Sequence, residues 1–530
     1  MIIKFEYVDN YTILYNERQE LEVSVKYIRD KINIKIMRYS QRYVKIIFGK
    51  TKFNKGEYLM DNILYDFNEN VINLMKSFLF NLEGNKDLSS FTDNLTDQFA
   101  QFGKNLIQNM IDYAEEIIFK LNGRNKMFES LEKDDRTITT IFGSISFCRR
   151  YYKDLETGNR IYLLDQYFEL KPNERLLQNV QARIIDEATI SSYQHAGEVA
   201  AYGEVISKEK VKNTIEDLNL DNKVIRTSKN SEKKKIKKLY IIADEDHVHL
   251  QKGGITEPRM VIIYEGIAKF GKRVVLQNKT HIGGNYDGKV EELWTEVLTY
   301  IENNYDTEYL ERIYLQGDGG AWIVSGKEYL IKAKYVLDEF HMKKAVNSIV
   351  GRITKINKEE NLATRKKLRD MLRKLDFESF KETCYEMIAE EMDSTARARK
   401  ERNMEYILNN IEGITNLYEN QEDLHGCSAE GHISHIYSDR MSSRPMGWKS
   451  ENVDKMSRLR LLREDGIRGK EILEKQGKIV EFEEIKKIRH QAKEKMEKTI
   501  NVRVGTVPAL KYGSDEEKNL LSNLLKLRVI

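Results

Sequence analysis

The middle of the chain has the clearest hydrophobic pattern, in which short apolar runs alternate with charged or glycine-rich segments. Compact apolar runs bounded by polar residues are typical of buried strands. A tight turn at Gly271 separates the second run from the third. The pattern therefore predicts five strands, at residues 239–243, 260–270, 272–280, 312–316 and 333–337.

Helical periodicity lies between these strands. After a loop at Gly283–Gly284, apolar residues repeat at helical spacing over residues 290–301, and residues 322–330 form a shorter candidate helix. The predicted order is β-β-β-α-β-α-β, which matches the RNase-H-like fold, an α/β fold with a mixed five-stranded sheet. In that fold the first and fourth strands lie side by side. We therefore expect an RNase-H-like core that begins with residues 239–350.

The segments before this core have weaker patterns. Residues 60–135 are predicted to be mainly helical, and residues 137–142 and 145–150 to form short strands. Residues 1–59 are tyrosine-rich and show no defensible period. Two interpretations of them stay open: a weakly ordered arm, or an extension upstream of a gene that starts at Met60.

A helix pair is predicted within residues 136–222. Residues 191–201 form one helix and residues 202–206 a turn, after which Ser207 caps a second helix. The spacing suits a DNA-binding helix-turn-helix, although two packed helices of an ordinary α-helical domain fit equally well. The candidate DNA contacts on the second helix are Lys208, Lys210 and Lys212.

Charged segments flank the core on both sides. A basic linker at residues 223–238 includes Lys233, Lys234 and Lys235, which suit phosphate contacts or a merely solvated linker. After the fifth strand, residues 351–424 are long, charged and helical, so they are predicted to be an all-α insertion. The core is then completed by a helix in residues 425–450, and residues 451–530 are predicted to be helical.

Composition narrows the class of protein. The chain has 87 basic and 84 acidic residues, a formal net charge of +3, so nucleic-acid contacts must come from local patches. The three cysteines, Cys148, Cys384 and Cys427, are far apart, which argues against a disulfide framework or a zinc site and favours the reducing cytoplasm. No secretory signal and no membrane-spanning apolar stretch is predicted.

Two carboxylates follow strands that the fold would place side by side. Asp244 ends the first strand and Asp318 follows the fourth. Asp246 competes with Asp244, but it is expected to point out of the following turn. Asp318 alone could be an ordinary turn aspartate in an Asp-Gly loop.

A third carboxylate is expected from the helix after the insertion. Ile433, Tyr437 and Met441 recur at helical spacing, and Glu430 is expected to share their inward face. Its rival on that helix is Asp439. Three carboxylates suit Mg²⁺ or Mn²⁺, and two such ions can catalyse in-line displacement at a phosphodiester.

Three segments resemble a known family. They are ADEDHV at residues 243–248, GDGGAW at 317–322, and the stretch from Glu430 through RMSSRPMGW at 440–448. They resemble the Lre-two-type insertion-sequence transposases, a bacterial family similar to the Mutator-like DDE transposases. The resemblance covers residues 60–470, and residues 1–59 depart from it.

The resemblance implies a DDE catalytic site at Asp244, Asp318 and Glu430. It also implies that the chain binds double-stranded DNA, both terminal inverted repeats and target DNA, and that it works as a homo-oligomer. Asp338 and His341 resemble the Asp/Cys-x-x-His motif of Mutator-like relatives and are auxiliary candidates, although His341 could simply hold the end of the fifth strand. Three further residues are expected near the edge of the site: Arg440, Arg444 and Trp448. The arginines would contact phosphates. The tryptophan would stack on a base, or it would simply pack against its own helix.

The leading hypothesis is therefore a DNA transposase of an insertion sequence, using two Mg²⁺ or Mn²⁺ ions to hydrolyse phosphodiesters and transfer strands. One alternative is a structure-specific nuclease of the same fold that cuts without joining. Another is an inactive, transposase-derived DNA-binding regulator.

Overall fold

The computed structural model describes residues 88–120, 124–221, 225–226, 232–271, 273–352, 358–444 and 446–479. The chain divides into two compact units, one formed by Met1–Arg175 with Lys495–Ile530 and one by Leu176–Glu494. Within the described ranges, no helix combines the length and apolarity that crossing a membrane requires. The residues predicted to take part in chemistry all belong to the second unit.

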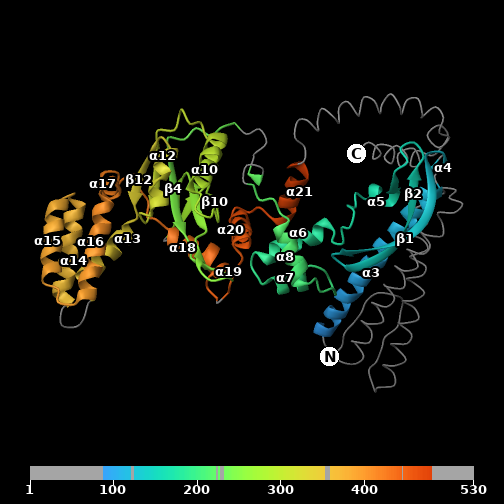
Figure 1. Ribbon diagram of the computed structural model, residues 1–530, viewed down its shortest axis with the longest axis horizontal. Helices are drawn as coiled ribbons and strands as arrows, with labels where there is room; N and C mark the ends of the chain where they lie inside the picture. The colour runs from blue at the N-terminus through green and yellow to red at the C-terminus, as the bar shows by residue number, and fades with distance from the viewer. Residues whose placement is uncertain are drawn as a thin grey trace, which may run out of the picture. The chain divides into compact units, whose positions relative to one another are not determined.

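The first unit contains a long helix, α3 (Leu88–Lys120), and a hairpin of β1 (Phe128–Thr140) and β2 (Gly143–Asp154), all in blue and cyan in Figure 1. Arg150 of β2 holds the helix by ion pairs with Glu115 at 3.1 Å and Glu116 at 2.7 Å. Three short elements complete the unit: α4 (Arg124–Met127), β3 (Arg160–Tyr162) and α5 (Leu163–Tyr167).

The hairpin is longer than the sequence predicted. β1 begins at Phe128, inside the segment expected to be helical, because residues 128–130 and 133–135 pair with β2 in an antiparallel ladder that is interrupted by a register shift. Gly143 is the first residue of β2 instead of the centre of the turn, and its φ of 108° suits glycine. The part of the predicted helical region at residues 60–87 and the extension at 1–59 lie outside the described residues.

The second unit is built around a mixed five-stranded sheet in the order β10-β7-β4-β11-β12. β4 (Lys238–Glu245), β11 (Arg312–Gly317) and β12 (Ala333–Leu337) are parallel, while β7 (Arg259–Tyr264) and β10 (Thr280–Gly284) add antiparallel strands beyond β4. The first and fourth sheet strands in chain order, β4 and β11, are neighbours, as the predicted order required. The expected mixed α/β sheet is confirmed.

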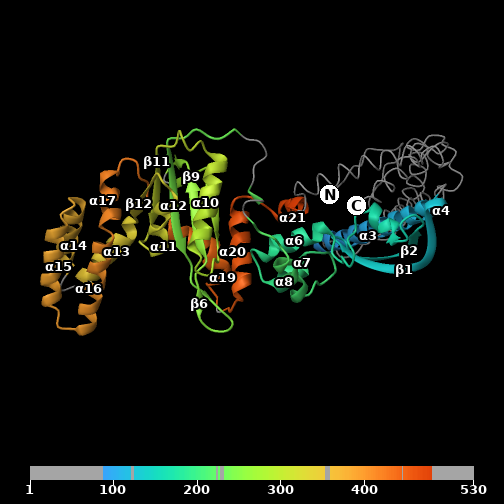
Figure 2. The same cartoon turned by 45° about the horizontal axis from the view of Figure 1, so that its top comes forward.

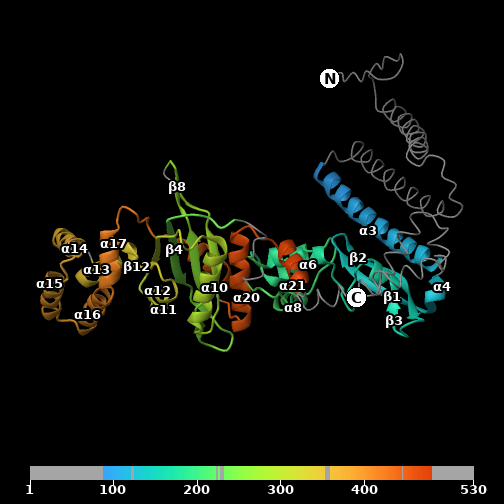
Figure 3. The same cartoon turned by 90° about the horizontal axis from the view of Figure 1, so that it is seen from above.

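Two strand predictions between β7 and β10 were wrong in their bounds. The predicted strand at 260–270 ends in the sheet at Tyr264, and β8 (Gly266–Phe270) pairs instead with β9 (Arg273–Gln277) as a separate hairpin that projects from the sheet (Figure 3). The third sheet strand is β10, which includes the glycines predicted as a loop. Gly283 is needed there because a side chain would collide with the carbonyl of Arg259 on β7.

Helices and a small hairpin surround the sheet. α10 (Val290–Asn304) buries Leu293, Trp294, Val297 and Ile301. Two short helices, α11 (Ala321–Val324) and α12 (Gly326–Tyr329), replace the single helix that was predicted before β12. After β4, the strands β5 (Val248–His249) and β6 (Ile255–Thr256) form a small hairpin, which is seen below the sheet in Figure 2.

The insertion after β12 is helical throughout its described residues, as predicted. α13 (Glu339–Val350) is followed by α14 (Lys358–Arg373), α15 (Phe377–Ala389), α16 (Ser394–Asn409) and α17 (Ile411–Glu419). These helices, orange in Figures 1 and 3, gather beside β12 at one edge of the sheet. α17 packs on β12, where Gly413 leaves room for the ring of Tyr335.

The helix pair predicted in the N-terminal half lies in the second unit. α6 (Gln178–Ala188) precedes α7 (Tyr193–Val199) and α8 (Lys208–Glu216). The Ser207 cap is confirmed, since its side chain accepts a hydrogen bond from the backbone N–H of Lys210. α20 (Ser450–Glu464) lies between this helix group and the sheet, contacting both α8 and β10, and α21 (Gly469–Ile479) packs on α6 (Figure 1).

One buried arginine joins these parts. Arg460 of α20 is 9% exposed and donates to the carbonyl oxygens of Ile436 at 2.5 Å, His435 at 2.7 Å and Thr189 at 2.9 Å. Ile436 and His435 belong to η1 (Ser434–Ser438), a π-helical turn between α18 (Ala429–Ile433) and α19 (Asp439–Met441). A charged donor satisfies three carbonyls at once, so it fixes the helix group against the segment that follows Glu430.

Candidate functional site

The central pair of the candidate site is Asp244 with Asp318. Ile242 of β4 is level with Gln316 of β11 in the parallel register, and each aspartate lies two residues further on. Residues two apart in a strand point to the same face, so the two carboxylates meet at the carboxyl end of the sheet. Burial raises the pKa of Asp244 to about 7, and the negative charge of Asp318 adds to that shift.

Short local hydrogen bonds orient both carboxylates. The backbone N–H of Glu245 donates to Asp244 Oδ1 at 2.9 Å, and that of Gly320 donates to Asp318 Oδ1 at 2.9 Å. Gly319 has a φ of 97°, so the loop turns back at a position where a side chain would be strained. The rim of the site is therefore shaped by the Asp-Gly-Gly sequence itself.

The insertion also reaches the Asp318 loop, which the sequence did not suggest. The hydroxyl of Tyr406, on α16, donates to the backbone carbonyl of Asp318. The side chain of Asn410 packs against Gly319, accepts from the Tyr335 hydroxyl at 2.9 Å and is 7% exposed. A segment nearly a hundred residues later thus holds the second aspartate in place.

Glu245 is a site residue that the predictions omitted. Its carboxylate accepts a hydrogen bond from the Trp322 indole N–H at 2.6 Å. Burial raises the pKa of Glu245, and the charge of Asp318 acts in the same direction. Alternation along a strand would turn a residue next to Asp244 to the opposite face, so only its position at the very end of β4 admits it to the site.

Asp338 and His341 are brought to the same place. Asp338 follows β12, caps α13 by accepting from the Phe340 N–H at 3.1 Å, and holds the His341 ring at Nδ1 at 2.8 Å. The hydrogen bond with Asp338 raises the pKa of His341, and the charges of Asp338, Asp318 and Asp244 add to the rise. Both roles considered for His341 are compatible with this position.

Glu430 is not where the sequence placed it. α18 contacts β4, and Ile433, Tyr437 and Met441 are buried as predicted, but Glu430 is exposed. Its expected place on the inward face was therefore wrong, because Glu430 lies in the first turn of α18 with its side chain exposed, while Ala429 beside it is buried. The described part of the chain has no group of three His, Cys, Asp or Glu side chains positioned to hold a metal ion.

A second missed residue occupies the space beside the carboxylates. Cys427, three residues before Glu430, is partly buried by its side-chain surroundings, and this burial raises its pKa far above the ordinary value. The charges of Asp338, Asp244 and Asp318 act on the same thiol. Mg²⁺ and Mn²⁺ prefer oxygen ligands to sulfur, so a thiol at this position suits packing next to the carboxylates.

The predicted DNA-contacting residues separate into two groups. Lys208, Lys212, Arg440, Arg444 and Trp448 line one pocket beside α7 and α8. Lys210 is exposed on α8 but does not line that pocket. In the basic linker, Lys234 forms an ion pair with Glu265 at 2.6 Å and its backbone bonds to Asn304, while Lys233 and Lys235 are exposed.

Arg440 and Trp448 are held by packing as well. Arg440 is 8% exposed and donates from Nε to the carbonyl of Ala188 at 3.1 Å. Trp448 is 8% exposed, donates to the Met441 carbonyl at 3.1 Å, and bonds through its backbone to His249 and Gln251 beside the β5–β6 hairpin. Both therefore have a structural role whatever else they contact.

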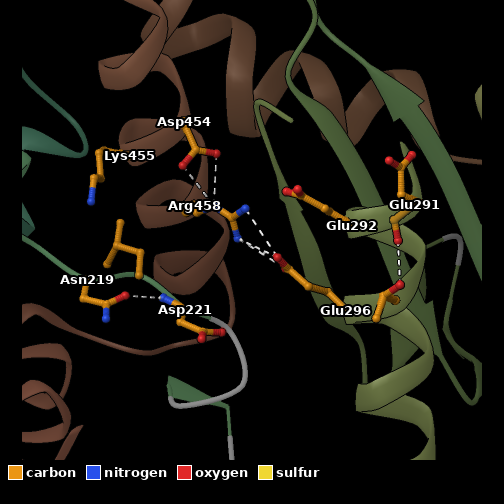
Figure 4. A pocket seen from close by; sticks show the side chains of 10 residues that line it. Asn219, Asp221, Glu291, Glu292, Glu296, Asp454, Lys455 and Arg458 are labelled. Atoms are coloured by element: carbon orange, nitrogen blue, oxygen red, sulfur yellow. Dashed lines mark hydrogen bonds and ion pairs between the residues drawn. The ribbon is translucent and has the colours of Figure 1, made fainter. Parts of the chain in front are cut away.

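A different pocket, between α10, α20 and residues 219–221, has a mainly acidic lining (Figure 4). Its lining includes Glu291, Glu292, Glu296 and Asp454. The one arginine there, Arg458, points at Glu296, with which it pairs at 3.2 Å, and also binds Asp454 at 3.0 Å. Its charge is already matched, so this pocket repels phosphate groups.

Comparisons with known proteins place the chain in one family. The model of the uncharacterised protein family UPF0236 matches residues 85–478. A UPF0236 protein of Caldanaerobacter subterraneus subsp. tengcongensis, whose name joins the loci TTE0033 to TTE2212, is 35% identical over 77% of this chain and 84% of its own length. UPF0236 protein TTE0402 of the same strain is 34% identical over 80% of this chain and 84% of its own. The chain therefore belongs to the uncharacterised protein family UPF0236.

Proposed function

We propose that this chain is a DNA transposase of an insertion sequence, with an RNase-H-like catalytic core that cleaves and joins phosphodiesters. The proposal rests on one observation above all: Asp244 and Asp318 lie level at the ends of adjacent parallel strands, β4 and β11. The strand order supports the RNase-H-like assignment, since the first and fourth strands are central neighbours. The resemblance of the three segments around these acids to insertion-sequence transposases supports the activity.

The two aspartates suit a divalent cation. Carboxylate oxygens are hard ligands, and Mg²⁺ is commonly bound by one or two carboxylates, with water and substrate phosphates completing its shell. Asp244 and Asp318 are near enough for one charge to raise the pKa of the other, a repulsion that a bound cation would relieve. When bound, Mg²⁺ or Mn²⁺ would activate the attacking oxygen and stabilise the leaving one.

The remaining site residues have roles that follow from their contacts. Asp338 fixes the ring of His341 and raises its pKa, which favours a positively charged imidazolium beside the carboxylates and suits contact with a phosphate oxygen. Trp322 fixes Glu245 at the edge of the site. The side chain of Glu430 is exposed on α18 next to β4 and forms no ion pair with any described residue, and Glu430 is the proposed third acid.

A relative adds independent support. Its name joins eleven loci of one strain. A protein encoded at many places in one genome is expected of an element that moves or copies itself. The proposal implies double-stranded DNA as substrate, a homo-oligomer that pairs two element ends, and a cytoplasmic location near the nucleoid.

The test uses purified full-length chain, labelled DNA of the element's own end, and Mg²⁺ or Mn²⁺. Wild type should cleave, whereas Asp318→Asn should bind the DNA without cleaving it. Asp246→Asn is the matched control, because Asp246 accepts from the Ser442 hydroxyl at 2.8 Å and has a structural contact instead of a place in the pair. Glu430→Gln should abolish cleavage without changing the unfolding transition.

The products separate the proposal from its alternatives. Joining of the cut end to a second DNA identifies a transposase, and cutting without joining identifies a nuclease. Binding by wild type without any cleavage identifies a regulator. Equal cleavage by wild type and Asp318→Asn would show that the choice of acids is wrong.

A further inference from the structure

Two helices of the insertion meet at the carboxylate site. α13 begins there with His341, and α16 ends there, where the Tyr406 hydroxyl donates to the carbonyl of Asp318. The two helices pack on one another (Figure 1), and Asn403 of α16 donates to the Ser348 hydroxyl of α13 at 3.1 Å. Ser348 lies about two turns after His341. Asn403 lies about one turn before Tyr406, so the sides of the helices that carry the two site residues are adjacent.

The same sides carry positive charge away from the site. On α16, Arg402 and Arg399 lie about one and about two turns before Tyr406, and therefore on its face of the helix. On α13, Lys344 lies about one turn after His341. All three cationic side chains are exposed, and together they are called the insertion track. The helical rise puts the two arginines about 6 Å and about 10 Å from Tyr406 along α16.

The charge of the insertion track is not matched by nearby acids. Within the described ranges, none of its three residues forms an ion pair, and the lysines of α13 and α16 that do so are Lys343 and Lys400. The exposed acids of α16, Glu401 and Glu405, are turned by about 100° or more around the helix from Tyr406. The track therefore presents a positive surface that suits a polyanion.

We infer that the insertion track binds the phosphate backbone of the DNA strand that enters the carboxylate site, an inference that rests on DNA being the substrate. Successive phosphates of one strand advance by about 3.4 Å along the duplex axis. A strand lying along α16 would bring to Arg402 and Arg399 the phosphates about two and about three nucleotides from the reacting one. Such contacts fix the register of a strand without reading its sequence. The track thus positions the reacting phosphate between the carboxylates.

The experiment measures how salt weakens DNA binding by the purified full-length chain. The probe is a fluorescein-labelled duplex of the element's own end, in EDTA, and anisotropy gives the affinity over a range of KCl concentrations. Each phosphate contact contributes about 0.9 to the slope of log affinity against log salt concentration. The double variant Arg399→Gln with Arg402→Gln should lower the slope by about 2 and weaken binding at least about tenfold near 0.1 M salt. Lys344→Gln should lower the slope by about 1.

Two control variants separate the charge of the track from its structure. Arg397→Gln removes an exposed arginine about two and a half turns before Tyr406, on the opposite face of α16, and should leave the slope unchanged. Arg399→Lys with Arg402→Lys keeps both charges and should keep the slope of wild type. An unchanged slope in the double glutamine variant, or an equal fall in Arg397→Gln, would overturn the inference.

Ethylation interference on the same complexes locates the contacts. Ethylation of the phosphates about two and about three nucleotides from the cleaved one should weaken binding by wild type, but not binding by the double glutamine variant. The same pattern of interference in both proteins would also overturn the inference.

Failure of the inference and of the proposed function can be told apart. A chain that cleaves the element end, but whose slope does not fall in the double glutamine variant, refutes the insertion track alone. A chain whose slope falls as expected but which never cleaves keeps the track and refutes the transposase. Absence of DNA binding by wild type refutes both.

Discussion

Replacing Asp244 by Asn should stabilise the metal-free chain while it abolishes the proposed cleavage. Burial, with smaller contributions from the charges of Asp318 and Glu245, raises the pKa of Asp244 from 3.8 to about 7. At neutral and higher pH the folded state must therefore hold a buried carboxylate that would be better solvated in the unfolded chain. Asparagine keeps the acceptor for the Glu245 N–H and removes the charge.

The pKa sets the size and the sign of the effect. A value of about 7 in place of 3.8 corresponds to about 4 kcal/mol, which is an upper limit because water can enter the site. We expect a gain of about 1–3 kcal/mol for Asp244→Asn. Since the folded pKa of this acid is raised, its destabilising contribution is absent below about pH 4 and grows as pH rises toward about 7. The gain should therefore be nearly absent near pH 4 and complete above pH 7.

Urea unfolding in EDTA, followed by tryptophan fluorescence, measures this directly. The chain has three tryptophans, Trp294, Trp322 and Trp448, and all lie in the second unit, so the signal reports the core that contains the site. Asp370→Asn on α14, whose side chain is 41% exposed, is the matched control and should change stability by less than about 0.5 kcal/mol. If Asp244→Asn is no more stable than wild type at pH 8, the carboxylate is not under electrostatic strain and the reasoning fails.

Three further changes test the packing that positions the site. Arg460→Met should destabilise the chain by about 3 kcal/mol in urea unfolding, because it leaves three buried carbonyls without a donor; an unchanged midpoint would contradict this. Gly413→Ala should lower the midpoint of thermal unfolding by several degrees, because the added Cβ would lie 2.5 Å from the Tyr335 ring. An unaltered midpoint would show that α17 can move to make room for it. Burial raises the pKa of Asp465, but the His281 hydrogen bond at 2.6 Å and a nearby arginine outweigh it and lower the pKa. Asp465→Asn should therefore cost stability at pH 7, with a difference from wild type that shrinks as pH falls through the folded pKa; a gap independent of pH would exclude this linkage.

Local sequence was sufficient to predict the central strands of the sheet and the two acids that follow them. Apolar runs ending at Asp244 and before Asp318 identified β4 and β11, and the order of elements made these strands neighbours. Strand burial and helical spacing are properties of a few consecutive residues, so they can be read from a window of the chain. The Ser207 cap and the helical insertion were predicted for the same reason.

Contacts between distant segments could not be predicted in this way. The sequence has no signal that Tyr406 and Asn410 would hold the Asp318 loop, or that Cys427 would lie beside the carboxylates, because these proximities depend on how the insertion folds back. The exposed place of Glu430, at the start of α18, was not visible either, because hydrophobic spacing identifies the buried face of a helix better than the orientation of its first turn.

The amino-acid sequence by itself determined the parallel strands β4, β11 and β12, the acids that follow β4 and β11, and the helical insertion, because each depends on short-range periodicity. Only the tertiary structure decided that β8 and β9 leave the sheet, and that lysines of α8, Arg444 and Asn452 share one pocket. The physical reason is that side chains hundreds of residues apart are brought together by packing of whole elements, and the free energy of that packing is not a property of any single segment.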